Sequence, residues 1–159
     1  MDEQPAEPAM LMNYALDLFN DGQLEAALEK DQEAFALLSK HTREDVLPEV
    51  RERLVSVYCY HLLQAELYEE LVEIATSPLA IDCGPTASIE YVHGLALLKL
   101  ERFEEAIEPF RKCIAKRDEP AFTARFKGVE GHGPYHLLAD CLAKTGQEEA
   151  ATARSTNKP

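Results

Sequence analysis

The stretch ASIEYVHGLALLKLERFEEAIEPFRKCIAKRDEP, residues Ala87–Pro120, decides the fold. Apolar residues recur at helical spacing over positions 89–97, break at ERFEE, and resume over positions 106–114. Apolar residues three and four positions apart line one face of an amphipathic helix. Small residues stand where two such helices must touch, Gly94 in the first run and Ala106 in the second. The stretch therefore predicts two antiparallel helices joined by a short turn at Glu101.

The same pattern occurs three more times along the chain. LMNYALDLFNDGQLEAALEKDQEAFALL places Ala15, Leu18, Gly22, Leu24, Ala27 and Ala34 in equivalent positions. VYCYHLLQAELYEELVEIA places Cys59, Leu62, Glu66, Tyr68 and Leu71 there, and YHLLADCLAKTGQEEAATA places Ala139, Leu142, Gly146 and Ala151. The expected turns at Gly22, Glu66, Glu101 and Gly146 are 44, 35 and 45 residues apart. Self-similarity of this kind predicts an array of helical repeats.

In the opening stretch, the small residue, leucine, turn, first aromatic, alanine and second aromatic are Gly94, Leu97, Glu101, Phe103, Ala106 and Phe110. This pattern resembles the tetratricopeptide repeat. The resemblance implies an all-α fold of antiparallel hairpins stacked as a right-handed α-solenoid. It implies one repeat domain over residues 8–155, with copies at about 8–41, 52–85, 87–120 and 132–155. Residues 1–7 are then a flexible segment and 156–159 a disordered tail.

Several local features refine this prediction. Asp45 is a suitable N-cap for a helix that begins near Val46, and Thr86 after Pro85 marks the start of another. SPLAIDCGPT reads as a loop between copies two and three, and Pro109 is placed near the first turn of its helix. The last copy is short and ends in polar residues, which suits either a capping helix or a fragment of a longer chain.

In this family the first helix of each hairpin lines a concave groove that binds peptides. The resemblance therefore implies a peptide-binding groove formed by Met12, Phe19, Asn20, Arg53, Tyr60, Gln64, Tyr91, Lys99, His136 and Asp140. Met12 and Leu16 occupy positions of the lysine–asparagine clamp that binds chaperone C-termini, so that clamp is absent. The expected function is non-catalytic protein or peptide binding, as a scaffold or adaptor, with homo-oligomers as a further option.

The segment FKGVEGHGPYHLL, Phe126–Leu138, suggests an alternative, because glycine-rich turns before a helix can bind phosphate. It lacks the lysine–serine/threonine ending and the preceding strand of a P-loop, so a joint with Pro134 at the first helical position explains it better. Six basic residues between 111 and 128 keep open an anion or small-ligand site over 111–136, with Arg125 and Lys127 as contacts. The stretch GVEGHGPYHLLADCLAKTGQEEA is also similar to repeat regions attached to bacterial glycosyltransferases, which implies an accessory module of a larger enzyme.

Composition limits the other function classes. A formal net charge of −13 argues against nucleic acid as a partner and favours a neutral or basic protein. No apolar run approaches the roughly 18 residues of a membrane span, and MDEQPAEP lacks the features of a secretory signal. Four widely spaced cysteines predict buried, reduced thiols in a cytoplasmic protein. We expect no catalytic residues and no cofactor, because no GxSxG, P-loop or HExxH pattern is present. We expect no metal site, because Gly133 and Pro134 lie between His132 and His136.

Overall fold

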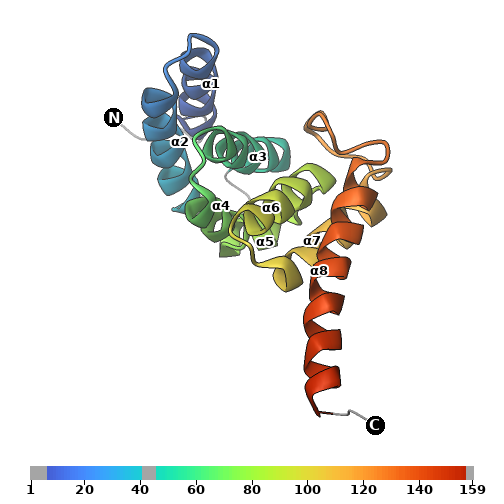
Figure 1. Cartoon of the computed structure of the whole chain (residues 1–159). Helices are drawn as coiled ribbons and strands as arrows, with labels where there is room; N and C mark the ends of the chain where they lie inside the picture. The colour runs from blue at the N-terminus through green and yellow to red at the C-terminus, as the bar shows by residue number, and fades with distance from the viewer. Residues whose placement is uncertain (1–6, 41–45, 157–159) are drawn as a thin grey trace. The chain divides into compact units, whose positions relative to one another are not determined.

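The computed structural model of the chain describes residues 7–40 and 46–156 (Figure 1). These residues form helices and contain no strand, which confirms the predicted all-α class. The helices are α1 (Glu7–Asn20), α2 (Leu24–Ser39), α3 (Pro48–Gln64), α4 (Tyr68–Ala75), α5 (Pro78–Cys83), α6 (Ala87–Lys99), α7 (Phe103–Lys116) and α8 (Gly133–Thr156). The predicted flexible segment 1–7 and tail 156–159 lie outside the described residues, except that Glu7 begins α1 and Thr156 ends α8.

The chain divides into two compact units. The first unit is Met1–Pro85 with Pro120–Ala124, and the second is Thr86–Glu119 with Arg125–Pro159. In the first unit, α1 packs along α2, and α3 contacts α1, α2, α4 and α5. In the second unit, α7 packs against both α6 and α8. Each unit therefore contains helical hairpins, while one solenoid domain over residues 8–155 stays a prediction.

Three of the four predicted turns share one backbone geometry. Their central residues, Gly22, Glu66 and Glu101, have positive φ angles of 81°, 60° and 59°. In each turn this residue donates its N–H to the carbonyl three residues before it. The next residue donates to the carbonyl five residues before it, at N···O distances of 2.8 to 3.0 Å. This is the Schellman motif, which satisfies carbonyls at a helix C-terminus. One turn geometry therefore occurs at three of the four predicted positions.

The fourth predicted turn, at Gly146, is wrong. Helix α8 runs without a break from Gly133 to Thr156, so Gly146 lies inside it. A glycine inside a helix costs about 1 kcal/mol relative to alanine. A turn at Gly146 would avoid this cost, but it would be favourable only if the residues after it formed a helix with an apolar face to bury. The sequence after Gly146, QEEAATARST, offers no apolar residue larger than alanine.

Two predicted helix starts have different outcomes. Helix α6 begins directly after Thr86, whose Oγ1 accepts a hydrogen bond from the Ile89 N–H at 3.3 Å, as predicted. Helix α3 instead begins at Pro48 with Leu47 in the N-cap position, because proline at the first helical position needs no hydrogen-bond acceptor. The proposed cap Asp45 lies outside the described residues.

Two further local predictions are corrected. The loop predicted in SPLAIDCGPT contains the short helix α5, and Ser77 Oγ caps it by accepting from the Ala80 N–H at 3.2 Å. Pro109 lies in the interior of α7 and not in its first turn. It cannot donate to the carbonyl of Glu105, an exposed residue, so water can satisfy that carbonyl.

The hairpins differ in the side chain that the second helix of each pair buries, nine residues after the turn. Counted from the turn residue, the ninth position holds Asp31 in α2, Ala75 in α4 and Phe110 in α7. Asp31, and not Ala34 as the sequence pattern suggested, is therefore the counterpart of Phe110. All three residues are buried.

Candidate functional site

The structure distributes the predicted groove residues over both units. Six of them are exposed: Asn20, Arg53, Gln64, Lys99, His136 and Asp140. Phe19, Tyr60 and Tyr91 are half-buried, and Met12 is buried. Those numbered up to 64 belong to the first unit and the others to the second. All ten lie on α1, α3, α6 or α8, the helices that the resemblance assigns to the groove.

Met12 does not present its side chain to a ligand. It is 1% exposed and belongs to the core cluster of Ala34, Leu38, Val46 and Leu54. The face of α1 that carries Met12 and Ala15 is the face buried in the first unit, because those two residues are three positions apart. The prediction of Met12 as a groove residue is therefore wrong, because its side chain is part of the core.

Phe19 and Tyr60 are the predicted groove residues that the first unit brings into contact. Their rings meet edge to face with centroids 5.8 Å apart. Phe19 also stacks on the His61 ring at 4.5 Å. Beneath this aromatic group, His61 Nδ1 and Asp31 Oδ2 form a hydrogen bond of 2.5 Å, with both side chains 1% exposed. Burial raises the pKa of Asp31, although the hydrogen bond and the charge of His61 act to lower it.

Tyr91 is fixed by packing in the second unit. Its ring lies edge to face with that of Phe110 at 6.4 Å, and it packs against the buried cluster of Ala87, Cys113 and Val129. A Cβ atom added to Gly128 would lie 2.6 Å from the Tyr91 hydroxyl oxygen. Gly128 also has a φ of 98°, so both space and backbone geometry require glycine there. Tyr91 therefore secures the glycine segment, which limits its role in a groove.

The glycine segment presents carbonyl oxygens to a cation. Arg117 Nη1 donates hydrogen bonds to the carbonyls of Val129 at 3.2 Å and Gly131 at 2.7 Å. Its guanidinium also lies 5.1 Å from the centre of the Tyr135 ring. A phosphate cradle needs convergent N–H groups, the opposite polarity. These contacts favour the interpretation as a joint. Helix α8 begins at Gly133, one residue before the predicted start at Pro134.

The basic residues around the joint are largely engaged in local contacts. Arg125 donates to the Glu119 carbonyl at 2.9 Å and lies 3.7 Å from the Glu130 carboxylate. Lys116 Nζ binds the buried Glu90 carboxylate at 3.1 Å. Burial raises the pKa of Glu90, an effect opposed by Lys116. Of the two proposed anion contacts, Arg125 is thus committed to neighbouring oxygens, while Lys127 is exposed.

The ionisable groups of the described residues offer little activated chemistry. Burial raises the pKa of Cys59 to about 12 and that of Cys113 to about 11, and it also raises the pKa of Cys83 and Cys141. A raised pKa keeps a thiol protonated and weakly nucleophilic. The rings of His132 and His136 lie 6.4 Å apart. Among the side chains that the structure describes, no group of three or more His, Cys, Asp or Glu could hold a metal ion.

A cavity in the first unit was not foreseen from the sequence. It measures about 90 Å³ and is lined by Pro48, Arg51, Glu52, Asp82, Cys83 and Phe122. Arg51 Nη2 binds the Asp82 carboxylate at 3.0 Å, and Glu52 accepts a hydrogen bond from the Thr123 N–H at 2.8 Å. The lining comes from α3, α5 and the segment 120–124, which are far apart in sequence, so no local motif could indicate it.

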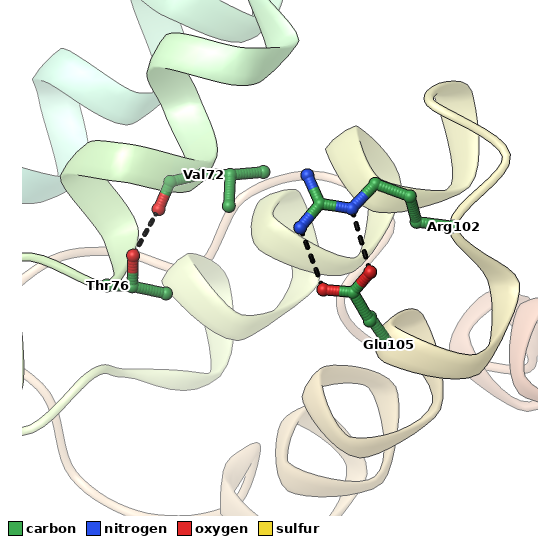
Figure 2. A network of polar contacts seen from close by, with 4 residues as sticks. All are labelled: Val72, Thr76, Arg102 and Glu105. Carbon is green, nitrogen blue, oxygen red and sulfur yellow. Dashed lines mark hydrogen bonds and ion pairs between the residues drawn. The ribbon is translucent and has the colours of Figure 1, made fainter.

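Two polar contacts in Figure 2 stabilise helix ends, one in each unit. At the end of α4, Thr76 Oγ1 donates to the Val72 carbonyl at 2.7 Å. At the start of α7, Arg102 Nε and Nη2 donate to the two Glu105 oxygens at 2.9 and 2.7 Å. The bidentate pair fixes the residue that follows the Glu101 turn. Both contacts are structural and take no part in the candidate site.

No protein-family model and no curated protein matches the chain. Among the helices of the described residues, none combines the length and the apolar character required to cross a membrane.

Proposed function

We propose that the chain is a non-catalytic polypeptide-binding module built from hairpins of the tetratricopeptide-repeat type, which acts as a scaffold or adaptor. The observation that carries this proposal is the turn repeated at Gly22, Glu66 and Glu101 with one hydrogen-bond pattern. Hairpins repeated in this way present the same helix of each pair to a ligand, which suits an extended or helical peptide.

The surface of the first helices supports this proposal. Asn20, Arg53 and Gln64 are exposed on α1 and α3, the two helices that carry the aromatic pair of Phe19 and Tyr60. An aromatic anchor surrounded by polar side chains is a common arrangement in protein interfaces. The His61 ring stacks on Phe19 and is itself held by its hydrogen bond with Asp31, so this buried pair fixes the position of the aromatic anchor.

The chemistry of the ionisable groups supports binding over catalysis. The Asp31–His61 pair could in principle transfer protons, but both side chains are 1% exposed and a substrate cannot reach them. The four cysteines have raised pKa values, so none is an activated nucleophile. The net charge of −13 favours a neutral or basic partner, because complementary potential steers association.

A random peptide library presented to the full chain tests the proposal. We expect selected peptides to bind with a Kd that rises at least about tenfold in a variant combining Asn20→Ala and Tyr60→Ala, since such anchors contribute 1–2 kcal/mol or more. Far-UV circular dichroism should remain unchanged. Glu73→Gln, at an exposed position of α4, is the matched control and should leave the Kd as it is. Selection of no peptide, or equal binding by the double variant, would contradict the proposal.

A further inference from the structure

The cavity of the first unit joins apolar and charged walls. Phe122 is 61% exposed, and together with Pro48 it provides the apolar side. Glu52, Asp82 and Arg51 provide the charged side, and Cys83 also lines the cavity. An exposed phenylalanine beside a charged cavity lacks an obvious role in stability, since its ring is left in water. The Phe122 ring is therefore accessible to a partner at the edge of the cavity.

The size of the cavity restricts what can enter it. At about 90 Å³ it is much smaller than the roughly 300–1,000 Å³ of sites for cofactors and drug-sized ligands. It is also smaller than the roughly 150 Å³ cavity that holds benzene. A single unbranched side chain from a protein partner suits this volume better than an aromatic ring or a free cofactor.

The charge of the lining selects the kind of side chain. Two carboxylates and one guanidinium give the lining a formal charge of −1. Arg51 Nη2 lies 3.0 Å from Asp82 Oδ2, so these two charges neutralise each other. One oxygen of the Glu52 carboxylate accepts a hydrogen bond from the Thr123 N–H, which leaves the charge of Glu52 in place. The Glu52 carboxylate thus carries the excess negative charge, which repels an acidic side chain and attracts a basic one.

Arg51 adds a second feature that points to a polypeptide. Its side chain is 7% exposed, and its Nη1 is buried without a hydrogen-bond partner among the described residues. An unpaired buried donor is costly, and such groups in native structures require an explanation. The Cys83 thiol hydrogen-bonds the Arg51 side chain, and a main-chain carbonyl of an incoming peptide can accept from Nη1 once this half-buried thiol gives way.

We propose that this cavity receives a lysine side chain of a bound polypeptide. The aliphatic stem lies against Phe122 and Pro48, and the ammonium group lies beside Glu52 and Asp82. Lysine commonly packs its methylenes on apolar surface in this way while its charge finds polar partners. This inference rests on the proposed polypeptide-binding function and assigns it a contact outside the predicted groove.

The direct test is titration of the full chain with Nα-acetyl-lysine methylamide, followed by backbone amide NMR shifts. We expect saturable shifts at Cys83 and Phe122 with a Kd in the millimolar range, about −4 kcal/mol for a single side chain. The norleucine analogue, which keeps the stem and lacks the charge, should bind about five- to tenfold more weakly, as for the loss of one charge-assisted contact. The glutamate analogue should not bind.

Variants locate the site. Glu52→Gln keeps an acceptor for the Thr123 N–H and removes the charge, so it should weaken the lysine probe about fivefold without changing the fold. Phe122→Ala should weaken the lysine and norleucine probes alike. Glu73→Gln is the control of equal charge change and should have no effect. Alkylation of Cys83, which is more accessible than the three buried cysteines, should slow in the presence of the lysine probe.

Several results would overturn the inference. These are absence of shifts around the cavity up to about 50 mM probe, equal binding of lysine and norleucine, or an unchanged Kd in Glu52→Gln. The first would mean that the cavity holds only water, and the others that it is an apolar pocket. If library-selected peptides bind and the lysine probe does not, the proposed function stands and this inference fails. If the probe binds and no peptide is selected, the cavity stands and the groove fails.

Discussion

The hairpin of α1 and α2 in the first unit and the hairpin of α6 and α7 in the second share a turn but not an interior. Both have the Schellman geometry, and Ala27 and Ala106 are fully buried five residues after the turn residue. Four positions later, α2 carries Asp31 and α7 carries Phe110. Turn geometry therefore specifies how two helices meet, and it leaves open what fills the space between them.

The two interiors are completed in different ways. In the second unit, Phe110 packs on Gly94, where an added Cβ would lie 2.8 Å from its ring. The glycine of one helix makes room for the ring of the other, so this hairpin fills its own interior. In the first unit, Ala15 occupies the position of Gly94, and the smaller Asp31 needs His61 from α3 as its partner. The first hairpin therefore depends on α3 for polar satisfaction, since a buried carboxyl without a partner is costly.

The largest effect is expected from emptying the apolar interior. Phe110→Ala should lower the free energy of unfolding by about 3–5 kcal/mol, because it leaves a cavity against Gly94 and Tyr91. Urea denaturation followed by circular dichroism measures this loss. Ile107→Ala, at a half-buried position of the same helix, is the control with a smaller cost. A loss below about 1 kcal/mol for Phe110→Ala would show that the second hairpin does not depend on this ring.

Breaking the polar interior should cost somewhat less. Asp31→Ala leaves His61 buried without its partner, and we expect a loss of about 2–3 kcal/mol. Adding His61→Phe should recover part of this loss, because it removes the imidazole that Asp31→Ala left unpaired, and Phe19 can stack on the new ring. A double-mutant cycle in urea should give a coupling energy of about 1–3 kcal/mol. Additive effects of the two substitutions would show that the pair contributes no mutual stabilisation.

A pH-dependent difference between the hairpins is expected at His93, whose counterpart in α1 is the exposed Tyr14. Burial, together with the charges of Arg102 and Lys112, lowers the pKa of His93 from 6.5 to about 4, although Glu105 opposes the shift. The folded state thus favours neutral His93. The stability that neutral His93 contributes is fully present above pH 6.5 and is lost as the pH falls towards 4. At pH 5 the free energy of unfolding should be lower by about 2 kcal/mol for this reason.

Unfolding measured at pH 7 and pH 5 in wild type and His93→Gln tests this expectation. The variant should lose less stability than wild type over this interval, since glutamine does not titrate. Comparison of the two proteins cancels the contributions of Asp31 and Glu90, whose pKa values are raised. Parallel pH profiles for the two proteins would refute a role for His93.

The smallest effects are expected at the shared turn, and they should have opposite signs. Gly22→Ala places a Cβ on a residue with left-handed backbone angles, which should cost about 1 kcal/mol of stability. No neighbouring atom lies within 4 Å of the added Cβ, so the cost is that of the backbone alone. Glu66→Gly and Glu101→Gly relieve the same strain and should each stabilise the chain by up to about 1 kcal/mol. Thermal denaturation resolves these changes. Destabilisation by both glycine variants would mean that the three turns are not equivalent.

The regions that the sequence predicted well are those formed by local interactions. The turns at Gly22, Glu66 and Glu101, the Thr86 cap and the joint around Gly128 each depend on hydrogen bonds or backbone angles within a few residues. Residue type and spacing determine such features, because their partners are near in the chain. The turn expected at Gly146 is an instructive failure, since a glycine permits a turn and only packing makes it worthwhile.

By itself, then, the sequence determined helical hairpins and the geometry of their turns. Only the tertiary structure decided that Met12 faces the core, that Asp31 pairs with His61, and that Phe122 meets Arg51 and Asp82 around one cavity. The physical reason is one of range. A turn is specified by hydrogen bonds between residues at most five apart, whereas burial, ion pairs and cavities depend on which helices pack together, and that choice is made by the whole unit.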